Sequence, residues 1–178
     1  VTYVGVANGD SDDFFKWMVN DLQKAGAGEV KLARMADRHA DPEEARKLLN
    51  AANCVFISGG DVSEGMRLLE ERNMISFLLR LYNQGVPFLG RSAGSIMLSR
   101  CWIRWRDPDD EATGELFPCL GFARVLCDTH GEGEGWEELH SLLRQAGDDQ
   151  VGYGIPTGIA MCVHPDETVE ALGGAVSR

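Results

Sequence analysis

The sequence predicts an α/β fold of three layers, in which helices cover both faces of a mostly parallel, doubly wound sheet. Two observations predict it. Short apolar runs alternate with amphipathic helical segments through about the first 100 residues, an alternation typical of parallel sheets. The pattern then changes, and the chain closes with two short runs on either side of residues 165–167, which predicts a C-terminal β-hairpin.

Each element of the first part has its own signal. Buried strands are expected where short apolar runs end in turns, at residues 2–8, 29–35, 54–60 and 87–90. Helices are expected at residues 11–27, 41–52, 62–71 and 75–83, and from residue 95 onward. Ser11 and Asp41 stand where helix N-caps belong, and Pro42 follows at a first helical position.

The second part is less regular. Residues 102–119 are acidic and rich in tryptophan, and we expect them to be irregular, with a solvated loop and no metal site at the acidic run 107–111. A strand is expected at 122–128 and a helix at 135–147. No repeat or linker interrupts the chain, so we expect one domain over residues 1–178. Because the chain starts and stops close to strands, we expect truncated ends that lack an edge strand.

The bulk composition limits the function. The net charge of −11 argues against nucleic-acid binding and against anionic membranes, because both need a basic surface. No apolar run is long enough to span a membrane, and no secretory signal is visible. The five cysteines are widely spaced and form no C-x-x-C pair, which predicts reduced thiols and a cytoplasmic protein rather than a disulfide framework or a zinc site. We expect no cofactor.

A serine between glycines is the first candidate for chemistry. Residues 90–94 match the pattern G-x-S-x-G between an expected strand and an expected helix, which is the context of a nucleophile elbow. Ser92 would be the nucleophile, and the alternative is a tight turn without chemistry. Gly60, which ends the strand expected beside it, could direct its N–H to the same point as the N–H of Ala93, forming an oxyanion hole. Asp61 is also a candidate cap for the next helix.

A nucleophilic serine needs a base. His39, His140 and His164 lie in a charged turn, in an amphipathic helix and beside a hairpin turn, so a surface or structural role is expected for them. His130 follows the strand expected at 122–128 and precedes a glycine-rich segment. The carboxyl end of a strand is where a partner for Ser92 is expected.

Three motifs carry a family resemblance. "FISGGD", "GRSAGS" and "CDTH" occur in the order and spacing of peptidase family S51, and the tail "GYGIPTGIAMCV" is similar to the family's closing segment. That family includes peptidase E and the cyanophycinases, and its fold is similar to that of the class I glutamine amidotransferases. The resemblance implies that Ser92 is the nucleophile, His130 the general base, and Gly60 and Ala93 the oxyanion hole.

The sequence departs from the family at the third catalytic position. The family completes its triad with a glutamate, where this chain has Thr157. Glu132 is our preferred replacement, because His-x-Glu is the spacing of class I amidotransferase triads, and Asp128 is the other neighbour. If the strand continues to His130, Asp128 and Glu132 would point to the same face as its ring. A metal site made by these three residues is the weaker alternative.

The substrate is expected to differ as well. The segment after His130 brings no basic residue before His140 and holds four acidic ones, Glu132, Glu134, Glu137 and Glu138. Such a wall would repel an aspartyl side chain, so a basic or neutral substrate, or the free amine of a peptide, fits better. Arg91 is the nearby positive charge that could bind a carboxylate, and Trp136, Trp102 and Trp105 are candidates for a pocket wall. Asp61 and Thr157 are further candidates for substrate binding.

These observations predict a serine hydrolase that cleaves a small peptide or amide bond through a Ser92–His130 pair and an acyl-enzyme. The alternative is a catalytically impaired or repurposed S51-like protein that binds a small molecule or a partner protein. An amidase-type transferase domain with serine in place of the usual cysteine is a third hypothesis. The resemblance also allows a homodimer.

Overall fold

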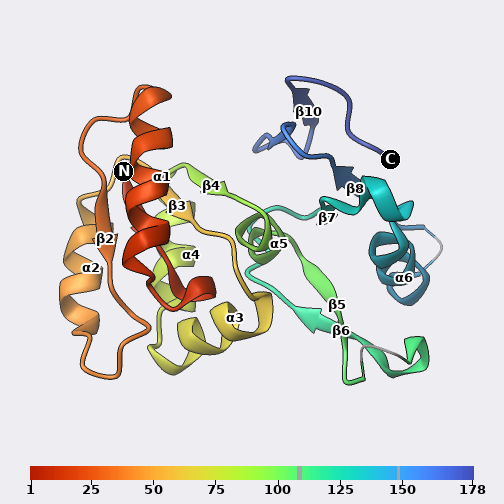
Figure 1. Ribbon diagram of the computed structural model, residues 1–178, viewed down its shortest axis with the longest axis horizontal. Coiled ribbons are helices and arrows are strands. Elements are labelled where there is room, and N and C mark those ends of the chain that lie inside the picture. The colour runs from red at the N-terminus through yellow and green to blue at the C-terminus, as the bar shows by residue number, and fades with distance from the viewer. Residues whose placement is uncertain (108–109, 148) are drawn as a thin grey trace. The chain divides into compact units, whose positions relative to one another are not determined.

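The computed structural model describes residues 1–107, 110–147 and 149–178 (Figure 1). Pro108 and Asp109, which belong to the expected acidic loop, lie outside the described residues. The chain forms two compact units, Val1–Ser95 and Ile96–Arg178, which are described separately. The single domain expected over 1–178 stays a prediction.

A parallel four-stranded sheet forms the centre of the first unit. Its strand order is β2-β1-β3-β4, from β2 (Lys31–Ala33), β1 (Thr2–Val4), β3 (Val55–Ile57) and β4 (Phe88–Gly90). Strand β1 pairs with both β2 and β3, placing Tyr3 between Leu32 and Phe56. Tyr3 is fully buried and stacks on Phe56, with ring centroids 5.7 Å apart. The expected mostly parallel sheet is therefore confirmed.

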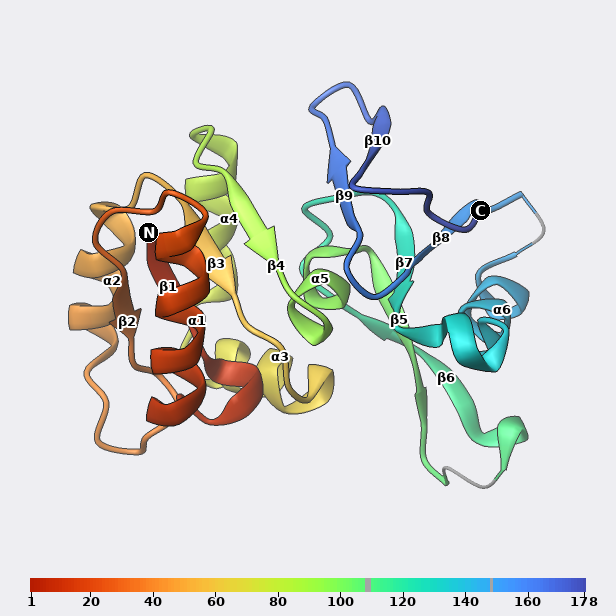
Figure 2. The same ribbon diagram turned by 45° about the horizontal axis from the view of Figure 1, so that its top comes forward.

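Helices cover both faces of this sheet, as Figures 1 and 2 show. Helix α1 (Asp12–Lys24) lies on one face, and α2 (Pro42–Asn50) and α4 (Ile75–Asn83) lie on the other. This follows from right-handed crossovers, since the chain moves one way from β1 to β2 and the opposite way from β2 to β3 and β4. Helix α3 (Val62–Glu71) follows β3 and packs beside the 3₁₀ turn η1 (Val6–Asn8).

The expected caps start these helices. The side chain of Ser11 accepts a hydrogen bond from the N–H of Phe14 at 3.3 Å, and that of Asp41 accepts one from Glu43 at 2.9 Å. Each satisfies a backbone donor that the first turn of a helix leaves without a partner.

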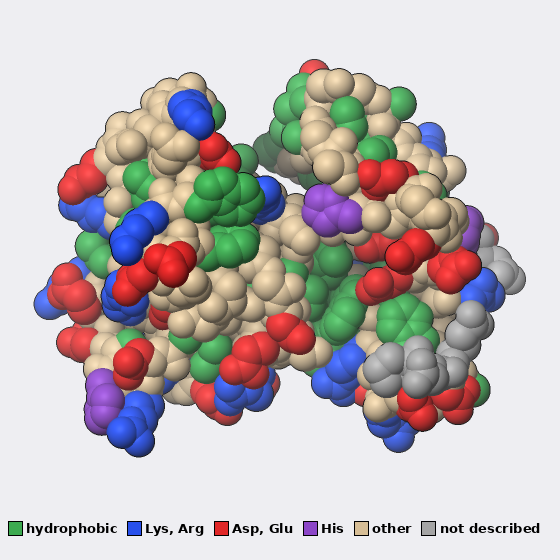
Figure 3. Space-filling view, viewed as in Figure 1, with side chains coloured by type: hydrophobic (Ala, Val, Ile, Leu, Met, Phe, Trp, Pro, Cys, Tyr) green, Lys and Arg blue, Asp and Glu red, His purple; other side chains and the backbone are tan. Residues whose placement is uncertain are grey.

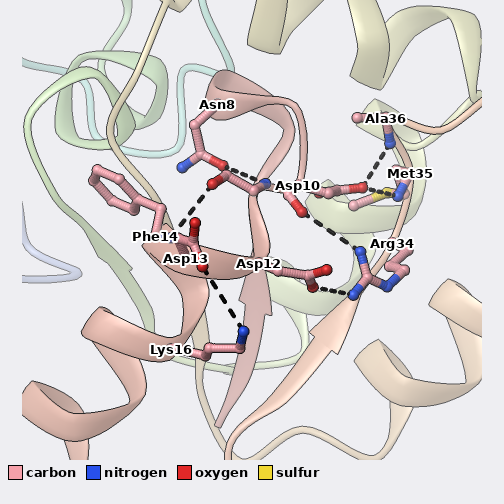
Figure 4. Close-up of polar contacts among 10 residues, drawn as sticks. Asn8, Asp10, Asp12, Asp13, Phe14, Lys16, Arg34, Met35 and Ala36 are labelled. Atoms are coloured by element: carbon pink, nitrogen blue, oxygen red, sulfur yellow. Dashed lines mark hydrogen bonds and ion pairs between the residues drawn. The ribbon is translucent and has the colours of Figure 1, made fainter.

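Asp10 ties the loop after β1 to the end of β2 (Figure 4). Its Oδ2 accepts hydrogen bonds from the backbone N–H groups of Met35 at 2.5 Å and Ala36 at 2.6 Å. Arg34, on the same segment, pairs with Asp12 in the first turn of α1. Asp10 is 5% exposed, and its carboxylate accepts the hydrogen bonds that strand partners no longer supply to this segment beyond Ala33.

The described residues of the second unit form three strand pairs and a helix of ten residues. Strands β5 (Cys101–Trp105) and β6 (Gly114–Pro118) are antiparallel, β7 (Leu126–Thr129) and β8 (Gly152–Ile155) are parallel, and α6 (Glu137–Ala146) connects the latter two. Strands β9 (Ala160–Val163) and β10 (Val169–Leu172) form the expected C-terminal hairpin. Helix α5 (Ala93–Leu98) begins in the first unit and ends in the second.

The expectation that residues 102–119 are irregular is wrong. Cross-strand pairs hold β5 against β6: Trp102 packs edge-on to Phe117, and Arg104 pairs with Glu115 and lies over the Phe117 ring. The opposite face buries Ile103 completely. Along β5, side chains that pair with β6 alternate with buried side chains. Those pairs form only when the two segments come together in the folded chain.

One buried hydrophobic cluster of this unit contains Cys101, Ile103, Leu126, Leu139 and Leu142. The five cysteines are all reduced, with no disulfide between them. Burial raises the pKa of the Cys119 and Cys127 thiols to about 12, so both are unreactive as thiolates at neutral pH. Among the described residues no helix is long and apolar enough to cross a membrane, and no three metal-ligating side chains converge.

Candidate active site

Ser92 occupies a sharp turn between β4 and α5. Its φ of 51° lies in the left-handed region, which costs a side-chain-bearing residue free energy and occurs mainly where surrounding structure enforces it. Both flanking glycines are needed for the turn to close. An added Cβ at Gly90 would lie 2.6 Å from the carbonyl carbon of Gly94, and one at Gly94 would lie 2.1 Å from the carbonyl oxygen of Ile57. The pentapeptide therefore makes the tight strand-to-helix turn that its pattern predicts.

Of the paired glycines after β3, the first lies directly against this serine. An added Cβ at Gly59 would be 3.2 Å from Cβ and 3.8 Å from Oγ of Ser92. Gly60 has a φ of 143°, and an added Cβ there would lie 1.9 Å from the carbonyl oxygen of Ala7. That carbonyl accepts a hydrogen bond from the N–H of Asp61 at 2.7 Å, which fixes the turn. Only glycine fits at Gly60.

Two backbone donors remain free at this turn. Within residues 1–95, no group accepts a hydrogen bond from the N–H of Gly60 or of Ala93. Ala93 is the first residue of α5, where N–H groups point out of the helix, and Gly60 adjoins the glycine that touches Ser92. Free donors beside a hydroxyl are what an oxyanion hole requires.

A polar network not predicted from the sequence holds the turn at Gly59 and Gly60. Asn8 donates from Nδ2 to Oγ of Ser58 at 2.8 Å and to the carbonyl of Gly59 at 3.0 Å. Tyr3 donates its phenol proton to the same Ser58 Oγ at 2.7 Å. Ser58 is fully buried. The available signal was a polar residue at the carboxyl ends of two neighbouring expected strands.

The other two candidates in this unit have structural partners. Arg91 places its guanidinium 4.1 Å from the centre of the Trp17 ring, with Nη1 2.7 Å from Sδ of Met18, so it fastens α1 to the turn. Asp61 caps α3, because its Oδ1 accepts a hydrogen bond from the N–H of Glu64 at 2.8 Å. Substrate binding by either residue stays a prediction.

His130 lies just beyond the end of β7 in the second unit. The strand stops at Thr129, and His130 takes a left-handed φ of 66°, so the expectation that strand alternation would orient Asp128 and Glu132 with its ring does not hold. The backbone N–H of His130 donates to the carbonyl of Ile155 at 3.2 Å. Its Nδ1 lies 3.2 Å from Oγ1 of Thr157, which follows the neighbouring strand β8.

The two candidate acids differ in their surroundings. Glu132 is exposed and accepts a hydrogen bond from the N–H of Thr157 at 3.0 Å. The hydrogen bond from the backbone of Thr157 is the main cause that lowers the pKa of Glu132, so it is ionised at neutral pH. Asp128 is 4% exposed and accepts from the N–H of Thr129 at 2.7 Å, and burial is the main cause that raises its pKa. Within the described part of the second unit, no hydrogen bond joins Asp128 to the His130 ring.

Trp136 packs inside this unit. An added Cβ at Gly154 would lie 2.5 Å from the indole ring, and one at Gly131 would lie 2.9 Å from it. The ring thus fills the space between β8 and the turn that carries Glu132. Trp102 donates its indole N–H to Glu138, whose pKa is raised by burial. Figure 3 shows acidic side chains gathered with a histidine on one face of the second unit.

Comparison with known protein families matches residues 1–171 to peptidase family S51. The chain belongs to this family. The resemblance seen in the sequence is thereby confirmed, and so is the expected α/β fold, because the similar solved structures below share it. The roles carried over to Ser92, His130, Gly60 and Ala93 stay predictions.

Curated relatives include the cyanophycinases of Synechococcus elongatus and Thermosynechococcus vestitus, each 29% identical over 157 residues. The match covers 83% of this S51 chain and 48% of each relative, so the chain spans about half the length of the curated relatives it matches.

Two solved structures show the fold. A peptidase from an acI-B1 Actinobacterium superposes with a TM-score of 0.73 at 18% identity, over 98% of this chain and 74% of its own. A putative peptidase E from Listeria monocytogenes superposes with a TM-score of 0.72 at 15% identity, over 96% of this chain and 84% of its own. This likeness agrees with the three-layer fold of the class I glutamine amidotransferases.

Proposed function

We propose that this S51 chain is a serine peptidase or amidohydrolase that cleaves a small peptide or amide bond. The observation that carries the proposal is the Ser92 turn, where a hydroxyl on a left-handed residue adjoins two glycines and two free backbone N–H groups. Membership in a peptidase family supports the same activity.

In the proposed reaction Ser92 Oγ attacks the substrate carbonyl while Nε2 of His130 takes its proton. The negative charge that develops on the carbonyl oxygen is stabilised by the N–H groups of Gly60 and Ala93. His130 then gives the proton to the leaving amine. A water molecule, activated by the same imidazole, releases the acyl group from Ser92.

The charge around His130 supports a basic or neutral substrate. Glu132 and Glu134 lie in the turn after His130, and no Lys or Arg falls within residues 128–138. An acidic surface attracts cationic groups and repels carboxylates. We therefore propose a substrate with a cationic side chain or a free amine close to the scissile bond.

A second candidate function rests on a specific observation. The residue beside Nδ1 of His130 is Thr157, which carries no charge. A neutral partner stabilises imidazolium poorly, which would favour a catalytically impaired member that binds a small molecule or a partner protein.

Labelling with a fluorophosphonate probe separates these functions. We expect stoichiometric labelling of the wild type, complete loss in Ser92→Ala, and strong loss in His130→Ala. Ser76→Ala, an exposed serine of α4, is the matched control and is expected to label normally. A folded wild type that does not label would refute the hydrolase and favour the binding protein. Light scattering of the same sample tests the expected homodimer.

A further inference from the structure

Thr157 and Glu132, which follow the neighbouring strands β8 and β7, lie next to each other beside His130. The parallel pairing of β7 with β8 sets Thr129 opposite Ile155, and the N–H of His130 extends the ladder by donating to Ile155. Thr157 thereby comes within 3.2 Å of Nδ1, and its backbone N–H donates to Glu132 at 3.0 Å. Backbone pairing, not side-chain packing alone, holds this arrangement.

Hydrogen-bond accounting assigns the protons. A general base must keep Nε2 free, so the neutral ring carries its proton on Nδ1 and donates it to Thr157 Oγ1. The hydroxyl then has one proton of its own to donate. The Glu132 carboxylate is the acceptor beside it, since the backbone N–H of the same Thr157 donates to Oε1 of that carboxylate at 3.0 Å.

We propose that Thr157 and Glu132 together replace the single triad carboxylate, with Thr157 as a positioning residue and Glu132 as the charge behind it. The inference rests on the proposed function. As Ser92 Oγ bonds to the substrate carbon, its proton moves to Nε2, and Nδ1 keeps its proton. No proton leaves Thr157. The hydroxyl holds the ring orientation and transmits part of the field of Glu132 to the imidazolium.

The β9–β10 turn provides an internal control. There Asp166 accepts hydrogen bonds from the N–H of Thr168 at 3.1 Å and from its hydroxyl at 2.6 Å. The first bond matches the one that the N–H of Thr157 makes with Glu132, and the second is the bond that we infer for the Thr157 hydroxyl. The β9–β10 turn has no assigned role. Asp166→Asn is therefore a matched variant for Glu132→Gln.

The first test measures the ring directly and needs no activity. The ¹⁵N shifts of His130 report which nitrogen is protonated, and we expect the Nδ1–H tautomer to dominate in the wild type and in Thr157→Ser. Thr157→Val removes the acceptor, and we expect the tautomers to mix. An unchanged tautomer in Thr157→Val would overturn the inference whether or not the protein is a hydrolase.

The second test measures the rate of fluorophosphonate labelling. We expect Thr157→Val and Glu132→Gln each to lower the rate by about tenfold to a hundredfold, the range of a charge-assisted hydrogen bond. The double variant should be no slower than the worse single one, because the two residues act as a unit. Asp166→Asn should label at the wild-type rate.

One rescue variant completes the design. Thr157→Glu restores the family's carboxylate at its usual position, and we expect it to label at least as fast as the wild type. In that background Glu132→Gln should no longer slow labelling. Wild-type labelling with no effect of Glu132→Gln would refute the inference while leaving the proposed function intact, whereas an unlabelled wild type would refute the proposed function, on which the inference rests.

Discussion

The substitution Gly94→Ala tests the Ser92 turn most sharply. An added Cβ would lie 2.1 Å from the carbonyl oxygen of Ile57 and 2.8 Å from that of Ser58, and real Cβ contacts are essentially never under 3.0 Å. Both atoms are backbone, so no side chain can rotate away. The turn must move by about 1 Å relative to β3, since close-packed interiors leave no free volume.

The magnitude follows from two opposing terms. Overpacking costs about 3 kcal/mol here, the upper end of its usual range, because rigid backbone is displaced. Alanine gains about 1 kcal/mol of helix propensity over glycine in α5. We therefore expect a loss of about 2 kcal/mol in the free energy of unfolding. A displacement of this size at the reacting atom also predicts labelling slowed by about a hundredfold.

Urea denaturation measures the loss in the free energy of unfolding, and fluorophosphonate labelling of the folded protein measures the loss in rate. Gly28→Ala is the control, because nothing lies within 4 Å of its added Cβ and its φ lies outside the left-handed region. That variant should be unchanged or stabilised by about 0.4–1 kcal/mol, through a less flexible unfolded chain. If Gly94→Ala is as stable and as reactive as Gly28→Ala, the close approach of α5 to β3 is not required for the site.

Three further predictions concern stability. Asp10→Ala should lower the free energy of unfolding, measured in urea, by about 2–4 kcal/mol, because two backbone N–H groups lose their acceptor. Asp12→Ala loses only an exposed ion pair and should cost less; equal losses would contradict the role given to Asp10. Burial raises the pKa of Asp128 above its unfolded value. The contribution of Asp128 to the free energy of unfolding is therefore fully present at low pH and is lost as pH rises through the folded pKa. Asp128→Asn should therefore melt at a higher temperature than the wild type at pH 7, with the gain vanishing below about pH 4; a gain independent of pH would refute this cause. Gly154→Ala should lower stability by about 1–3 kcal/mol and change the near-ultraviolet circular dichroism, because its Cβ would lie 2.5 Å from the Trp136 ring; an unchanged spectrum would exclude that contact.

The sequence predicted the first unit better than the second, for a physical reason. Local signals define βαβ units: Ser11 and Asp41 cap helices where expected, and helices α3 and α4 have the expected bounds. In the second unit, β8 was missed because Gly152 and Gly154 weaken a strand signal. Gly152 lies close to leucine side chains of α6, and Gly154 lies close to the Trp136 ring. These contacts require glycine, and they cannot be inferred from the neighbouring sequence.

The sequence by itself determined the fold class, the family and the tight turn at Ser92, since each depends on short-range periodicity or on residues within one pentapeptide. The tertiary structure decided what surrounds them. It placed Gly59 against Ser92, gave Asn8 a role beneath the glycine turn, and set Thr157 between His130 and Glu132. Those contacts join residues far apart along the chain. They depend on which strands pair and where each strand ends, and pairing is a property of the folded chain rather than of any segment.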